Sequence, residues 1–94
     1  MNPSLHRAAS GYLTLNFNDG LDAWLGVVRR LENVLGFVRE GSTHQGFDEA
    51  IFPNFVSANC ILEAGYDNWS GNYLLSQSAE GDKLLQEIFN VIHA

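Results

Sequence analysis

Hydrophobic and polar residues alternate along several stretches of the chain, with the period of two that is typical of a half-buried strand. In the first stretch Leu13, Leu15 and Phe17 alternate with polar neighbours, and Phe37 with Val38 adds a short candidate strand later on. The predicted strands are residues 11–17, 37–38, 55–66 and 72–77. A turn-forming segment joins the last two, so we expect them to form an antiparallel hairpin.

The apolar period changes to three and four residues in two other segments, which predicts amphipathic helices. Asn18, Asp19 and Gly20 supply turn and N-cap chemistry before the first helix, and Gly36 is expected to end it. The apolar stripe of this helix consists of Leu21, Trp24, Leu25, Val28, Leu31 and Leu35. The second helix begins after the N-cap candidate Ser78 and carries the stripe Leu84, Leu85, Ile88, Phe89 and Ile92.

Two segments between these elements have no clear period. Residues 40–46 have the composition of a mobile loop or a wide hairpin connection, and residues 47–53 could form a helical turn that Pro53 ends. The order of elements predicts an α+β fold in a single domain over residues 1–94. We expect a two-layer sandwich, with a small, mostly antiparallel sheet of three to four strands covered by two amphipathic helices.

Charge narrows the choice of partners. Eleven acidic and five basic residues give a formal net charge of −6. Binding to nucleic acid or to an anionic membrane needs a positive surface, so the charge argues against both, and we expect neither as a partner. The excess lies within residues 41–94, where seven acids stand beside Lys83 alone. If these acids share one face they attract a basic protein, and if they are dispersed they only keep the chain soluble.

Several classes of protein are not indicated. No apolar run approaches the ~18 residues of a membrane span. The N-terminus lacks the pattern of a secretory signal, so we expect a cytoplasmic protein. The single cysteine, Cys60, excludes an intrachain disulfide framework. Alternation assigns Cys60 to the buried face of its strand, which favours an inert thiol.

Catalytic motifs are weak in this sequence. The zinc-binding helix motif, the P-loop and the nucleophile elbow are all absent. His44 with Asp48 and Glu49 is the nearest approach to an acid/base or cation-binding cluster. Carboxylates in a polar loop are more often simply solvated, so a small enzyme built on this cluster is the least favoured alternative. We predict no catalytic residue, no cofactor and no metal ligand.

Aromatic residues and carboxylates gather around the predicted hairpin turn. Tyr66, Trp69 and Tyr73 fall within eight residues of sequence. Turns lie on the surface, and Trp and Tyr are enriched at interface hot spots, although Trp69 could instead fold back over the edge of the sheet. The candidate partner-binding residues are Asp48, Glu49, Glu63, Tyr66, Asp67, Trp69 and Tyr73.

The segment Tyr66-Asp67-Asn68-Trp69-Ser70-Gly71 resembles the Tyr-Asp-Asn-Trp-x-Gly turn of small bacterial immunity proteins of contact-dependent inhibition and related polymorphic toxin systems. The size of the chain, its acidity and its C-terminal helix are also similar to those of such proteins. The resemblance covers about six residues closely and residues 55–94 loosely. It implies an immunity protein that binds a basic toxin C-terminal domain, in many systems a nuclease, and blocks its active site or substrate surface. The alternative is a self-associating scaffold domain that forms a homodimer through a strand edge and the aromatic turn.

Overall fold

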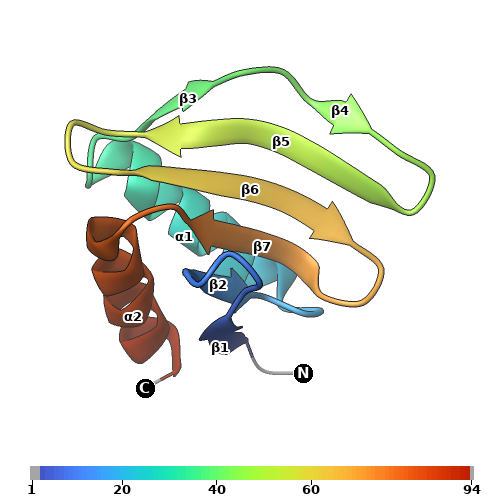
Figure 1. Ribbon diagram of the computed structural model, residues 1–94, viewed down its shortest axis with the longest axis horizontal. Coiled ribbons are helices and arrows are strands. Elements are labelled where there is room, and N and C mark those ends of the chain that lie inside the picture. Colours follow the sequence, from blue (N-terminus) through green and yellow to red (C-terminus); the bar gives the residue numbers. More distant parts are fainter. Residues whose placement is uncertain (1–2, 94) are drawn as a thin grey trace.

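Seven strands form one antiparallel sheet in the computed structural model, which describes residues 3–93 (Figure 1). The sheet order is β1-β2-β7-β6-β5-β3, and β4 pairs with β5 as well. The strands are β1 (Ser4–Arg7), β2 (Leu13–Asn16), β3 (Val38–Glu40), β4 (His44–Gln45), β5 (Glu49–Val56), β6 (Ile61–Asp67) and β7 (Gly71–Ser76). The helices are α1 (Leu21–Asn33) and α2 (Ala79–His93).

The chain is α+β, but the predicted small sheet of three to four strands is wrong. Residues 55–66, expected as one strand, are divided between β5 and β6 by a turn. The hydroxyl oxygen of Ser57 accepts hydrogen bonds from the N–H groups of Asn59 and Cys60, at 3.2 and 3.3 Å. A serine that bonds the following backbone in this way produces a tight turn without Gly or Pro, so composition does not reveal it.

Residues 47–53 lie mostly in β5, so the expected helical turn there is also wrong. Pro53 is tolerated because the register between β5 and β6 shifts between Phe52 and Phe55, which marks a bulge in the ladder. The carbonyl oxygen of Pro53 accepts two hydrogen bonds from the Arg39 guanidinium, at 3.2 and 3.0 Å. The edge strands β1 and β4 are four and two residues long, too short for a period to be read.

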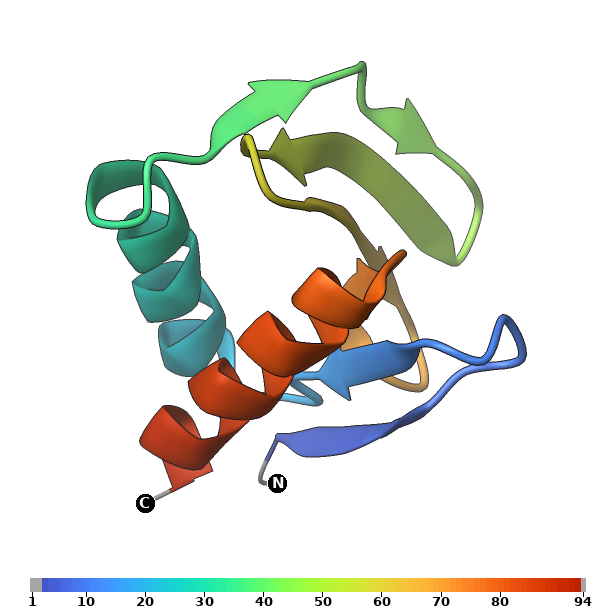
Figure 2. The same cartoon turned by 60° about the vertical axis from the view of Figure 1, so that its left-hand side comes forward.

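Both helices lie on the concave side of the curved sheet (Figure 2). The core is formed by buried side chains that the sheet directs toward the helices and by their partners on α1 and α2. Its members include Leu15, Phe55, Leu62 and Leu74 from the sheet and Trp24, Leu31, Leu85 and Ile88 from the helices. The opposite side of the sheet carries no helix; we call it the outer face.

The helix predictions are confirmed in position and corrected in detail. On α1 the buried residues are Trp24, Val27 and Leu31, whereas the expected stripe members Leu21 and Leu25 are exposed. Its N-cap position is occupied by Gly20, and no side chain caps this end. The helices have 13 and 15 residues, and neither is long and apolar enough, within the described residues, to cross a membrane.

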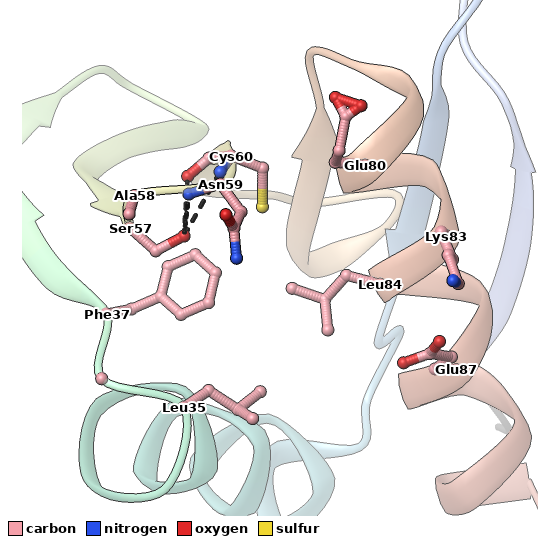
Figure 3. A pocket seen from close by; sticks show the side chains of 11 residues that line it. Leu35, Phe37, Ser57, Ala58, Asn59, Cys60, Glu80, Lys83, Leu84 and Glu87 are labelled. Atoms are coloured by element: carbon pink, nitrogen blue, oxygen red, sulfur yellow. Dashed lines mark hydrogen bonds between the residues drawn. The ribbon is translucent and has the colours of Figure 1, made fainter.

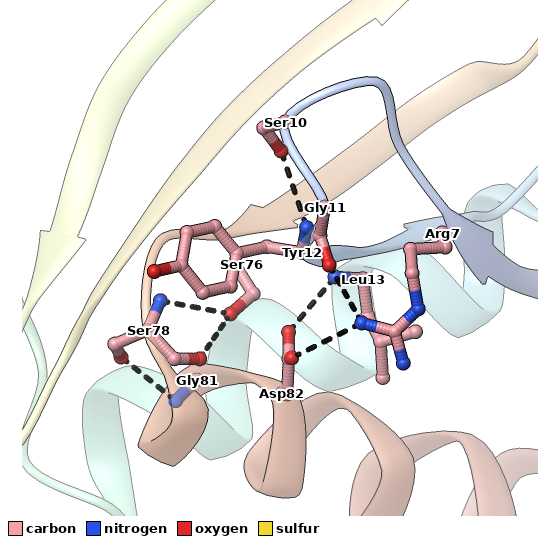
Figure 4. A network of polar contacts seen from close by, with 9 residues as sticks. All are labelled: Arg7, Ser10, Gly11, Tyr12, Leu13, Ser76, Ser78, Gly81 and Asp82. Atoms are coloured by element: carbon pink, nitrogen blue, oxygen red, sulfur yellow. Dashed lines mark hydrogen bonds and ion pairs between the residues drawn. The ribbon is translucent and has the colours of Figure 1, made fainter.

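A polar network attaches α2 to the first two strands (Figure 4). The Ser78 hydroxyl accepts a hydrogen bond from the Gly81 N–H at 3.0 Å, which confirms Ser78 as the N-cap. One carboxylate oxygen of Asp82 accepts the Leu13 N–H at 2.8 Å, and the other lies 3.7 Å from the Arg7 guanidinium. The side chains of Asp82 and Arg7 therefore have a structural role, since they join α2 to β1 and β2.

Candidate functional site

Two hairpin connections meet at one end of the sheet. The β4–β5 connection contains Phe47 and Asp48, and the β6–β7 turn contains Asn68 and Trp69. Glu49 at the start of β5 pairs with Asp67 at the end of β6, so the two connections lie beside each other (Figure 1). The fold thus brings together two segments that are about twenty residues apart in the sequence.

The backbone of the β6–β7 turn is held by a side chain from the end of β6. One carboxylate oxygen of Asp67 accepts hydrogen bonds from the N–H groups of Trp69 and Ser70, at 2.9 and 2.6 Å. Gly71 follows with a positive φ of 67°, and a side chain there would collide with the carbonyl of Asn18. Asp67 therefore has a structural role in the turn, in addition to the partner-binding role predicted for it.

Trp69 does not fold back over the sheet, because 90% of its side chain is exposed. Phe47 on the neighbouring connection is fully exposed as well. A hollow of about 250 Å³ between the two connections is lined by Asp48, Glu49, Asp67, Asn68 and Trp69. We call these five residues together with Phe47 the hairpin-end surface. Its carboxylates and aromatic rings can bind a basic and partly nonpolar partner.

The sequence does not indicate Phe47 as a candidate partner-binding residue. The composition of residues 40–46 indicates a loop or a wide hairpin connection, but Phe47 lies outside that segment, in residues 47–53, where the sequence allows a helical turn. Two aromatic residues in hairpin connections of the same sheet end are recognised only after β4, β5 and β6 have been paired. The other predicted residues fall into two groups around this surface.

Tyr66 lies on the concave side of the sheet, where it is 39% exposed and lines a second hollow with Leu21 and Trp69. Tyr73 and Glu63 lie on the outer face. Burial raises the pKa of the Tyr73 hydroxyl, and the nearby charges of Asp67, Glu63 and Glu49 raise it further. The carboxylates of Asp67, Glu63 and Glu49 therefore all lie near Tyr73, so the hairpin-end surface continues onto the outer face.

Gln77 holds Glu63 in place, because its side-chain amide donates a hydrogen bond to the Glu63 carboxylate at 2.5 Å. The seven predicted residues are thus spread over one end of the sheet and its outer face, with Tyr66 on the other side. Asp48 and Glu49 are exposed, while Glu63 and Asp67 are half-buried.

Another hollow, of about 560 Å³, lies between the end of α1, the β5–β6 turn and α2 (Figure 3). Phe37, Cys60 and Leu84 line it. Cys60 is half-buried instead of fully inside, because the turn at residues 57–60 ends the alternation that assigned it to the core. Burial raises the pKa of its thiol, with a further contribution from the charge of Glu80, so the thiol is a weak nucleophile at neutral pH.

The acid/base cluster considered for catalysis is only partly assembled. Asp48 and Glu49 line the hairpin-end hollow, whereas His44 lies on β4 opposite Ile51. Within residues 3–93 no group of three His, Cys, Asp or Glu side chains is placed to hold a metal ion. Comparison of the chain with protein-family models, with curated proteins and with solved structures finds no match.

Proposed function

We propose that this chain is an immunity protein that binds a cognate bacterial toxin domain, a nuclease, in the cytoplasm and blocks its active site or substrate surface. The observation that carries the proposal is the hairpin-end surface, where Trp69 and Phe47 are exposed beside three carboxylates. Nucleases bind phosphate groups with Lys and Arg, and carboxylates can occupy the same donors. The resemblance of residues 66–71 to the turn of immunity proteins supports the same function.

The two kinds of residue contribute differently to binding. Exposed carboxylates such as Asp48 and Glu49 accelerate encounter with a basic partner and make it dependent on salt. Aromatic side chains such as Trp69 lose their contact with water on binding and act as hot spots. The rigid β6–β7 turn presents Trp69 without a large ordering cost, because its backbone is already fixed by Asp67.

The test is co-expression with the toxin C-terminal domain encoded beside this gene, followed by measurement of growth and of the dissociation constant. The wild-type chain is expected to restore growth and to bind the domain. Trp69→Ala is expected to weaken binding by about 2–4 kcal/mol, which corresponds to about 30- to 1000-fold in Kd. Phe47→Ala is expected to weaken it in the same direction.

Val91→Ala is the matched control, since Val91 is an exposed apolar residue on α2, away from the hairpin-end surface. It should bind as the wild type does. The thermal stability of all variants should stay near that of the wild type, because each removed side chain is exposed. A wild-type chain that neither binds the toxin domain nor restores growth would overturn the proposal.

Self-association remains the second candidate, and one feature favours it. Strand β1 stands at the edge of the sheet and, among residues 3–93, pairs on one side only, with β2. An open edge of this kind can pair with the same strand of another copy. Light scattering over a range of concentrations distinguishes the two candidates, since this one requires a mass that rises to that of a dimer.

A further inference from the structure

The outer face of the sheet carries exposed aliphatic side chains in the part formed by β3, β5 and β6. Strand register places Val38 opposite Val56, and Val56 opposite Ile61. Val38, Ile51 and Ile61 are 57%, 51% and 39% exposed. Both helices lie on the other side of the sheet (Figure 2). A sheet face that no helix covers and that is partly apolar offers a surface for another protein.

Carboxylates border this apolar area, and the basic side chains that register places on the same face are the histidines His6 and His44. Register and alternation place Glu40, Glu49, Glu63 and Asp67 on the outer face, and Asp48 lies at the adjoining hairpin end. Neither Lys nor Arg occurs on this side. The outer face and the hairpin ends therefore hold five of the six units of net negative charge.

All five bases lie on the helix side of the sheet. Arg29 and Arg30 are on α1 and Lys83 is on α2. Arg7 pairs with α2, and the Arg39 guanidinium stacks 3.9 Å above the ring centroid of the core residue Phe55. The remaining six acids stand with these five bases, which leaves a net charge of −1 there. The two sides of the protein therefore differ strongly in charge.

We propose that the outer face is the main docking surface of this protein, and that its partner is a protein with a nonpolar strip bordered by Lys and Arg. The strip packs on Val38, Ile51 and Ile61, while the basic side chains reach the surrounding carboxylates. The hairpin-end surface then forms one margin of the same contact. The partner's identity as a toxin rests on the proposed function, whereas its chemistry rests on this face alone.

The helix side is the competing surface, because it also exposes apolar residues such as Leu21, Val34 and Val91. Its near-neutral charge, however, offers a basic partner no electrostatic preference. Charge complementarity therefore selects the outer face.

The probe for the test is a synthetic peptide of alternating arginine and leucine residues, titrated into isotopically labelled full-length protein. Amide chemical shifts in two-dimensional NMR report where it binds. We expect the shifts to concentrate in β3, β5 and β6 and at the two hairpin connections. Shifts confined to α1 and α2, or no binding at low salt, would overturn the proposal.

Two pairs of variants with equal charge changes sharpen the test. Glu49→Gln with Glu63→Gln removes two outer-face charges and is expected to weaken peptide binding about tenfold at low salt. Glu80→Gln with Glu87→Gln removes two charges from α2 and should change the affinity for the peptide less than about twofold. Equal losses of peptide affinity in both pairs of variants would mean that only the net charge of the protein matters. That result would refute the proposed docking surface.

The apolar contact is tested by comparing Ile51→Ser with Val91→Ser. Both residues are exposed aliphatic residues, and they lie on opposite sides of the protein. We expect only the first to reduce affinity for the peptide. Measured against the toxin domain, the same variants separate the two proposals. If the toxin is neutralised by both variants alike, the docking surface is wrong while the immunity function stands. If the peptide binds to the outer face but the toxin domain is not bound, the docking surface stands and the immunity function is wrong.

Discussion

At Gly65 the absence of a side chain is required by the residues around it. A Cβ atom at this position would lie 2.5 Å from the Tyr73 hydroxyl oxygen and 2.7 Å from the carbonyl oxygen of Ala50. A glycine in the middle of a strand usually weakens it, but here the Tyr73 ring on the neighbouring strand covers the gap. The pair packs closely at the centre of the outer face.

Gly65→Ala is expected to destabilise the protein by about 1–3 kcal/mol, because the clash includes backbone that cannot move aside. Gly26→Ala is the contrasting variant. Its Cβ would meet nothing within 4 Å in the middle of α1, and it should stabilise the fold by about 0.5–1 kcal/mol. Denaturant unfolding measures both. If the two substitutions changed the free energy of unfolding in the same direction, this account of Gly65 would be contradicted.

Tyr73 also makes stability depend on pH. Its folded pKa is raised above the ordinary value of 10.0, first by burial and then by the charges of Asp67, Glu63 and Glu49. The folded state therefore holds this proton to higher pH than the unfolded chain does. Its contribution to stability is complete below about pH 10 and is lost as the pH rises through the folded pKa.

We accordingly expect Tyr73→Phe to lose less stability than the wild type between neutral pH and pH values above about 10. NMR titration of the Tyr73 ring should give a pKa above the ordinary value. Glu63→Gln should lower that pKa without restoring the ordinary value, since burial is the larger cause. A Tyr73 pKa at or below the ordinary value would disprove the assignment.

Among the elements, α2 and the β6–β7 hairpin follow directly from local sequence, whereas β5 does not. The helix has a capping serine, acids in its first turn and a continuous apolar stripe. Strand β5 contains Pro53 and an exposed start, and its pairing with β6 is interrupted by a bulge. Its existence depends on partners on both sides, β6 on one and β3 with β4 on the other.

The N-cap of α2 provides the test at this scale. Ser78→Ala removes the acceptor of the Gly81 N–H and should cost about 1 kcal/mol. For a domain of this size that lowers Tm by about 4–8 °C. Ser42→Ala, an exposed serine between β3 and β4, serves as the control and should leave Tm nearly unchanged. Equal Tm values for the two variants would show that the cap contributes nothing.

For the whole molecule, the separation of charge between the two sides is the main consequence of the fold. Glu40, Asp48, Glu49, Glu63 and Asp67 come from three strands and one connection, yet they gather on one side. Two copies of this protein that met through their outer faces would repel each other, because each face carries several carboxylates and neither Lys nor Arg.

We therefore expect the protein to be monomeric at micromolar concentration and low salt. Light scattering at about 20 mM and 500 mM salt measures this, since the higher concentration screens the repulsion between the faces. A dimer that is present at low salt and persists at high salt would favour pairing through an edge such as β1. It would then support the self-associating alternative.

The sequence by itself determined the α+β class, the two helices, the N-cap at Ser78 and the hairpin around residues 67–71. Each of these depends on contacts between residues close in the chain, which periodicity and capping reveal. Only the tertiary structure decided the seven-stranded sheet, the exposure of Phe47 and Trp69, and the side on which the acids meet. These features depend on register between distant strands and on the bulge at Pro53. Local patterns do not encode such pairings, because the stabilising contacts form only when the whole sheet has assembled.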